Sequence, residues 1–128
     1  MLESKDVIAT IAVKDLEAAS KFYEGTLGLS RMGPSPDPTA ITYQSGRSGV
    51  LVYQSQYAGT NQATSASWAV GDDLDAVVDD LRSKGVKFEQ YDLPGLTREG
   101  DVHVMGELRA VWFKDPDGNI LNLVNQAM

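Results

Sequence analysis

One segment of the chain collects most of the side chains that could do acid–base chemistry. Residues 91–106 contain the only histidine, His103, together with charged residues, and Glu107 follows directly. An imidazole has a reference pKa near ~6.5, so it can exchange a proton near neutral pH. His103 is therefore the candidate general base. No carboxylate is evidently paired with it, and a single surface histidine more often has no catalytic role.

Other chemistries are excluded by residue types that the chain lacks. There are no cysteines, which excludes disulfides, thiolate metal sites and cysteine nucleophiles. The net charge is −7 without a basic stripe, so the chain disfavours nucleic acid as a partner. No apolar run approaches the ~20 residues of a membrane span. The polar N-terminus has no signal-peptide core. We expect a cytoplasmic protein with no membrane partner.

The elements that must position these side chains occur in two successive sets. Each set begins with a strand, continues into a helix preceded by an aspartate, and ends with further strands. The expected strands are residues 7–13, 29–32, 40–44, 50–54, 65–70, 86–90, 108–114 and 119–125. The helices follow Asp15 and Asp72 or Asp73, and Leu74, Val77 and Leu81 mark the buried face of the second helix. Residues 92–106, with Pro94, Gly95 and Gly100, are expected to form a long loop.

The two sets also share letters. The sequence IAVKDLEA beginning at Ile11 matches WAVGDDLDA beginning at Trp68, with one insertion. Such a repeat fixes the architecture, because neither half can bury its sheet face alone. We expect one α+β domain over residues 1–128, with βαβββ modules at about 5–56 and 64–126. These would form a curved mixed sheet of about eight strands, with helices on the convex side and an open concave cleft.

Four short motifs carry a family resemblance. They are Val13-Lys14-Asp15-Leu16, Phe22-Tyr23, Leu27-Gly28-Leu29 and Asp115-Pro116-Asp117-Gly118-Asn119. In this order the chain resembles the glyoxalase/bleomycin-resistance/extradiol-dioxygenase superfamily, also called vicinal oxygen chelate proteins. The resemblance implies the fold and not the activity, because one fold hosts many chemistries. The motif residues themselves are interpreted as a helix cap, helix-to-sheet packing and a turn.

The resemblance also implies where a metal ion would be bound. Metal-dependent members place His, Gln or Glu on the first and last strands of a module. The corresponding positions here are Ile8, Val52 or Tyr53, Ser65 or Ala66, and Asn122. None is a histidine or a carboxylate, whereas a divalent ion needs several converging ligands. We therefore expect no metal and no cofactor.

Strand alternation predicts what the concave face holds instead. Ile11, Val13, Val111 and Phe113 should face the helices, which leaves small, apolar and neutral polar residues on the open side. Such a lining suits an organic ligand. The expected ligand-binding residues are Thr10, Tyr43, Tyr53, Ser67, His103, Met105, Trp112 and Asn122. Trp112 is the best aromatic platform, with ordinary packing or a dimer contact as the other interpretation.

Two functions remain open from the sequence. The first is metal-independent binding, or sequestration, of an aromatic or cationic natural product or antibiotic. By resemblance to bleomycin-resistance-type members, the binding cleft would lie at the interface of a homodimer. The second is a metal-independent lyase, isomerase or hydrolase that uses His103, Glu107 or tyrosines as acid and base. A conventional glyoxalase or dioxygenase comes third, because the implied ligands are missing.

Overall fold

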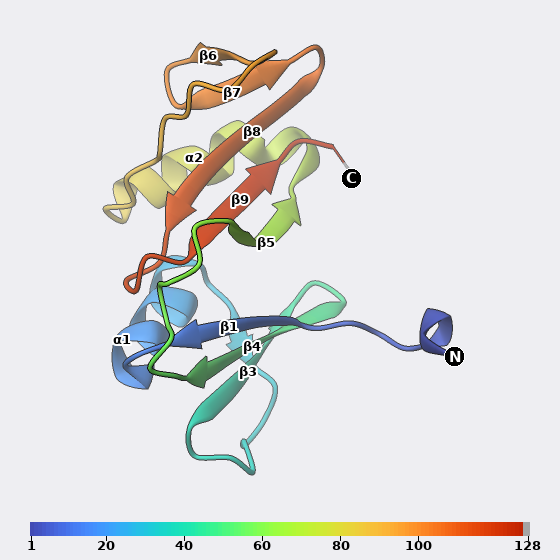
Figure 1. Cartoon of the computed structure of the whole chain (residues 1–128), viewed down its shortest axis with the longest axis vertical. Coiled ribbons are helices and arrows are strands. Elements are labelled where there is room, and N and C mark those ends of the chain that lie inside the picture. Colours follow the sequence, from blue (N-terminus) through green and yellow to red (C-terminus); the bar gives the residue numbers. More distant parts are fainter. Residues whose placement is uncertain (127–128) are drawn as a thin grey trace. The chain divides into compact units, whose positions relative to one another are not determined.

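A computed structural model of the chain describes residues 1–126 and divides it into two compact units. The first unit comprises Met1–Ser65 together with Asp115–Asn119. The second comprises Ala66–Lys114 and the residues from Ile120 onward. Each unit contains a helix and most or all of one sheet (Figure 1). The expected α+β class is confirmed.

The strands number nine within residues 1–126, and their hydrogen-bond ladders form sheets of four and five strands. A single sheet of about eight strands was expected. Two strands, β6 and β7, come from the segment that was predicted to be a loop, and the strand predicted at residues 86–90 is absent. Over the same residues, no helix has the length and apolar character needed to cross a membrane.

The first sheet has the strand order β1-β4-β3-β2, in which β1 is parallel to β4 and the other neighbours are antiparallel. A short helical turn, η1 (Leu2–Ser4), precedes it. The strands are β1 (Ala9–Val13), β2 (Ser30–Arg31), β3 (Ala40–Ser45) and β4 (Ser48–Gln54). Helix α1 (Leu16–Ser20) continues into a π-helical turn, η2 (Lys21–Thr26).

Local sequence explains the first unit. Ile11 and Val13 are buried, as alternation predicted. Asp15 is the N-cap of α1, because its Oδ1 accepts the backbone N–H of Glu17 at 2.9 Å. Tyr23 is fully buried. The predictions of a cap at Asp15 and of packing by Tyr23 are therefore confirmed.

The second sheet has the order β5-β9-β8-β7-β6. Its strands are β5 (Thr64–Ala69), β6 (Thr97–Glu99), β7 (Val102–Met105), β8 (Leu108–Lys114) and β9 (Ile120–Val124). A turn, η3 (Gly71–Asp73), leads into α2 (Leu74–Ser83), which lies behind β8 in Figure 1. The buried residues of α2 are Leu74, Val78 and Leu81. Val77 was predicted in place of Val78 and is only half-buried.

Two predictions in this unit are wrong. Residues 86–90 were expected to form a strand, but Phe88 makes only an isolated bridge to Phe113. Residues 92–106 were expected to form a loop, but β6 and β7 form a hairpin there. The sequence analysis missed this hairpin because the glycines and the proline of the segment were interpreted as signs of a loop. Gly100 occupies the hairpin turn with φ +65°, so the glycine connects the two strands rather than marking irregular structure.

Candidate functional site

His103 lies on β7 with its side chain almost completely buried, at 1% exposure. The expectation of a surface histidine in a loop is therefore wrong. Its Nε2 accepts the backbone N–H of Tyr91 at 2.9 Å. Its Nδ1 is also buried and has no hydrogen-bond partner within residues 1–126. The imidazole is thus fixed at one nitrogen and unpaired at the other.

The contact at Nε2 determines where the imidazole proton lies. A nitrogen that accepts a hydrogen bond carries no proton, so the neutral ring carries its proton on Nδ1. Nδ1 is therefore a buried donor. Leaving such a donor unpaired costs about 1–3 kcal/mol, and more than ~90% of buried polar groups in proteins are paired. Among the described residues, Nδ1 of His103 is the one buried side-chain polar atom without a hydrogen-bond partner.

Two aromatic rings, Tyr91 and Trp112, contact the imidazole of His103. We call these three residues the aromatic cluster. The rings of His103 and Trp112 are nearly perpendicular, with centroids 4.8 Å apart. Tyr91 lies 5.8 Å from His103 and 5.6 Å from Trp112. Burial raises the pKa of the Tyr91 hydroxyl. The buried Nδ1 of His103 therefore lies among aromatic rings.

Strand register explains why these side chains meet. His103 is opposite Ala110 in the β7–β8 ladder, and Trp112 is opposite Asn122 in the β8–β9 ladder. Val111 and Phe113 are fully buried, so Trp112 and Asn122 lie on the other face of the sheet, as predicted.

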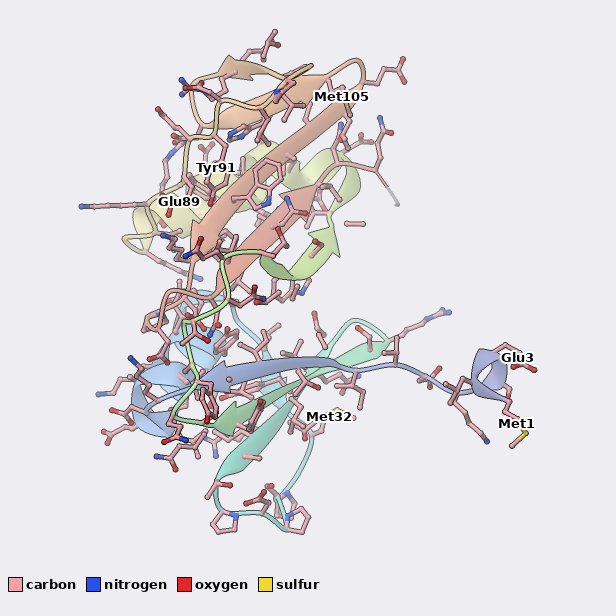
Figure 2. The ribbon with its side chains drawn as sticks, in the orientation of Figure 1. Met1, Glu3, Met32, Glu89, Tyr91 and Met105 are labelled. Carbon is pink, nitrogen blue, oxygen red and sulfur yellow. The ribbon has the colours of Figure 1, made fainter. Side chains whose placement is uncertain are left out.

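The segment before β6 supplies the third ring. The Glu89 N–H donates to the Trp112 carbonyl at 2.8 Å, and the Tyr91 N–H binds His103. Figure 2 shows Glu89 and Tyr91 beside β8. Sequence reasoning missed Tyr91. Its position depends on a tertiary hydrogen bond to His103, twelve residues away, which no local pattern reveals.

The other residues of this unit that were predicted to bind a ligand differ from one another in burial. Asn122 is buried, and its Nδ2 donates to the Val111 carbonyl at 3.1 Å. Met105 is half-exposed at the end of β7, and Ser67 is exposed on β5. The register therefore places four of the predicted residues on one face: His103, Met105, Trp112 and Asn122.

In the first unit, Thr10 and Tyr53 are exposed on strands β1 and β4, which pair with one another. Tyr43 was predicted to line the open face, and this is wrong. It pairs with Val50 on the face of β3 that carries the core, and its ring stacks on Tyr23 at 6.1 Å. Its hydroxyl donates to Glu24 at 2.8 Å.

The family motif of the β8–β9 turn is structural. Asp115 is buried and accepts hydrogen bonds from the Tyr23 hydroxyl and the Asn119 amide, both at 2.8 Å. Asp117 accepts the Lys14 N–H at 3.0 Å. Burial, followed by the Asp115 charge, raises the pKa of Tyr23 far above its usual range. The interpretation of Asp115 and Asp117 as turn residues is confirmed.

The donor set does not fit a divalent metal ion. Across the described part of the chain, no group of three or more His, Asp and Glu residues is placed to hold one. His103 supplies one imidazole, whose Nε2 is already engaged by Tyr91. A typical site needs three or four such ligands at one point.

Comparison with known proteins gives the family. The model of the Glyoxalase/Bleomycin resistance protein/Dioxygenase superfamily matches residues 6–123. The chain belongs to this superfamily. No curated protein matches the sequence significantly.

Solved structures support the fold at low sequence identity. An integron cassette protein from the Halifax Harbour Sewage Outfall metagenome is 21% identical with TM-score 0.71, over 95% of this chain and 99% of that one. The fosfomycin resistance protein FosX from Mesorhizobium loti is 18% identical with TM-score 0.69, over 100% and 96%. FosX from Listeria monocytogenes, complexed with Mn(II) and sulfate, is 16% identical with TM-score 0.73, over 100% and 94%.

Proposed function

We propose that this protein binds a small aromatic organic molecule without a metal ion, with Trp112 forming one wall of the site. The observation that carries the proposal is the aromatic cluster on the face of the second sheet opposite Val111 and Phe113. Aromatic walls with few polar groups are typical of sites for organic ligands. The donor set of the described residues does not fit Mn(II), the ion bound in the Listeria FosX complex.

The resistance proteins among the similar structures make an antibiotic a reasonable ligand class. We propose sequestration rather than turnover. A general base must accept a substrate proton through a free lone pair, whereas the Nε2 lone pair of His103 already accepts the Tyr91 N–H. The metal-independent enzyme is the less well supported alternative for this reason.

Replacement of Trp112 tests the proposal. Loss of the aromatic wall removes apolar contact and a stacking contribution of ~0.5–1.5 kcal/mol. Trp112→Ala should therefore weaken binding of an aromatic ligand about tenfold, which corresponds to ~1.4 kcal/mol. The measurement is a thermal-shift screen of aromatic natural products and divalent metals, followed by titration of each hit. A ligand at 100-fold its Kd should stabilise the native protein by ~2.7 kcal/mol.

The control is Tyr57→Ala, which removes an aromatic side chain that is 69% exposed in the first unit. It should leave both folding and binding unchanged. Equal affinity of wild type and folded Trp112→Ala for every hit would contradict the proposed site. Stabilisation by a divalent metal alone would contradict metal-independent binding.

A further inference from the structure

The aromatic cluster contains one buried hydrogen-bond donor whose partner is missing among the described residues. The Nδ1–H of His103 donates to no described residue, while the Tyr91 N–H holds the opposite nitrogen of the ring. The ring therefore cannot satisfy Nδ1 by exchanging its tautomer, because that would place a proton against the Tyr91 N–H. A partner for Nδ1 must be a hydrogen-bond acceptor.

The charges around the cluster indicate which kind of acceptor fits. Arg98, opposite His103 in the β6–β7 ladder, is bound to Gln90 at 2.7 Å and Asp92 at 3.3 Å. Arg82 is paired with Asp101 at 2.7 Å. Lys114, whose charge acts on Tyr91, is paired with Glu89 at 3.1 Å. These cations are thus already paired, so a buried carboxylate or phosphonate would lack compensation. An uncharged carbonyl oxygen has a much smaller desolvation cost.

We propose that the Nδ1–H of His103 selects ligands that carry an uncharged carbonyl group on an aromatic ring, by donating a hydrogen bond to the carbonyl oxygen. The aromatic ring would pack against Trp112, 4.8 Å from His103 by ring centroids. This inference rests on the proposed function and adds the chemical class of the ligand.

Access to Nδ1 requires movement of a neighbouring ring, because the atom is buried. In this proposal Tyr91 is the ring that moves, because it lies outside the strands and two residues before the exposed Leu93. A rotation of its side chain leaves the backbone N–H on Nε2, so the donor stays on Nδ1 while the ligand ring replaces the phenol.

The experiment uses a matched pair of probes, 1-indanone and indane, which differ by the carbonyl oxygen. His103 is the only histidine, so its imidazole signals in a ¹⁵N–¹H spectrum need no assignment by mutation. The free protein should show the Nδ1–H tautomer. Added 1-indanone should move the Nδ1 proton signal downfield, whereas indane should not. Wild type should bind 1-indanone about tenfold more tightly than indane, since a net hydrogen bond is worth about that ratio.

His103→Gln is the variant test, because its amide oxygen can still accept the Tyr91 N–H while the Nδ1 donor is lost. The preference for 1-indanone should fall to about onefold. Val104→Thr, a near-isosteric change at the next position of β7, should keep the preference. Folding of each variant is checked by circular dichroism, and the wild-type spectra test the inference even if His103→Gln does not fold.

The outcomes separate the two proposals. If both probes bind with equal affinity and Trp112→Ala weakens both, the proposed function stands and the role of His103 is wrong. If neither probe perturbs Trp112 or His103, binding of aromatic ligands at this face is wrong, and the inference falls with it. An Nε2–H tautomer in the free protein would overturn the inference alone.

Discussion

Two tyrosine hydroxyls in the first unit each donate a hydrogen bond to a carboxylate, and the two carboxylates differ in burial. Tyr23 donates to the buried Asp115, whereas Tyr43 donates to Glu24, which also binds the exposed Arg31 at 3.0 Å. The hydrogen bond from Arg31, followed by that from Tyr43, lowers the pKa of Glu24. The sequence motifs Phe22-Tyr23 and Asp115-Pro116-Asp117-Gly118-Asn119 are therefore linked by a hydrogen bond, which explains how they support the fold.

Removal of the Tyr23 hydroxyl should lower the free energy of unfolding by about 1–3 kcal/mol, because hydrogen bonds to charged groups lie at the upper end of the usual range. Tyr23→Phe keeps the ring and its packing. The measurement is urea denaturation near pH 7. Tyr57→Phe, at an exposed ring, should change the unfolding free energy by less than about 0.5 kcal/mol. Equal stability of the two variants would show that the Tyr23–Asp115 bond contributes little.

At the residue scale, sequence reasoning placed Trp112 and misplaced Tyr43. Trp112 lies between Val111 and Phe113, two apolar neighbours that fix the facing of β8. Tyr43 lies between two polar residues, Thr42 and Gln44, which give no such signal, so its facing depends on the pairing with Val50. Burial of a tyrosine also requires a partner for its hydroxyl, and Glu24 is nineteen residues away.

The segment between β4 and β5, residues 55–63, packs against the β8–β9 turn within the first unit. Gly59 has φ +73°, and a Cβ atom at this position would overlap the Asp117 carbonyl oxygen. Ala58 beside it is buried. The sequence predicted only a polar linker here, because close approach of two backbones leaves no periodic pattern.

Gly59→Ala should therefore lower the free energy of unfolding by more than the cost of placing alanine in a left-handed conformation. That conformation costs a non-glycine residue about 1–2 kcal/mol, and the clash with backbone adds to it. Gly46→Ala is the matched control, since Gly46 has φ +57° and a Cβ atom added there would meet nothing within 4 Å beyond its chain neighbours. Thermal and urea unfolding of both variants measure the difference. Equal losses of stability would mean that the linker moves away from the turn at little cost.

At the scale of the whole molecule, the repeat allowed the fold class to be predicted, because two copies of one pattern constrain the architecture more than any single motif does. The repeat did not predict the hairpin that contains His103. Its strands are three and four residues long and are separated by Gly100 and Asp101. Such short strands become recognisable only when a neighbour such as β8 supplies the ladder.

The sequence also predicts a homodimer, which we propose as the assembly of this protein. Val7 is 88% exposed and Ile8 is 46% exposed, directly before β1. β1 is an edge strand of the first sheet, and Met32 is also exposed in this unit. Exposed apolar residues beside an open strand edge are typical of surfaces that pair with another chain. A symmetric pair of copies would cover the same surface on both.

Light scattering at micromolar concentration should give twice the chain mass of 13.8 kDa. Replacement of both apolar residues by aspartate, Val7→Asp with Ile8→Asp, should shift the protein to 13.8 kDa particles because charge repels across a symmetric contact. Tyr57→Asp, at an exposed position away from β1 in sequence, should leave the dimer intact. A wild-type particle of 13.8 kDa throughout the micromolar range would contradict the homodimer. A dimer unaffected by the double substitution would place the interface on another surface, since two buried charges per chain are not tolerated in an apolar contact.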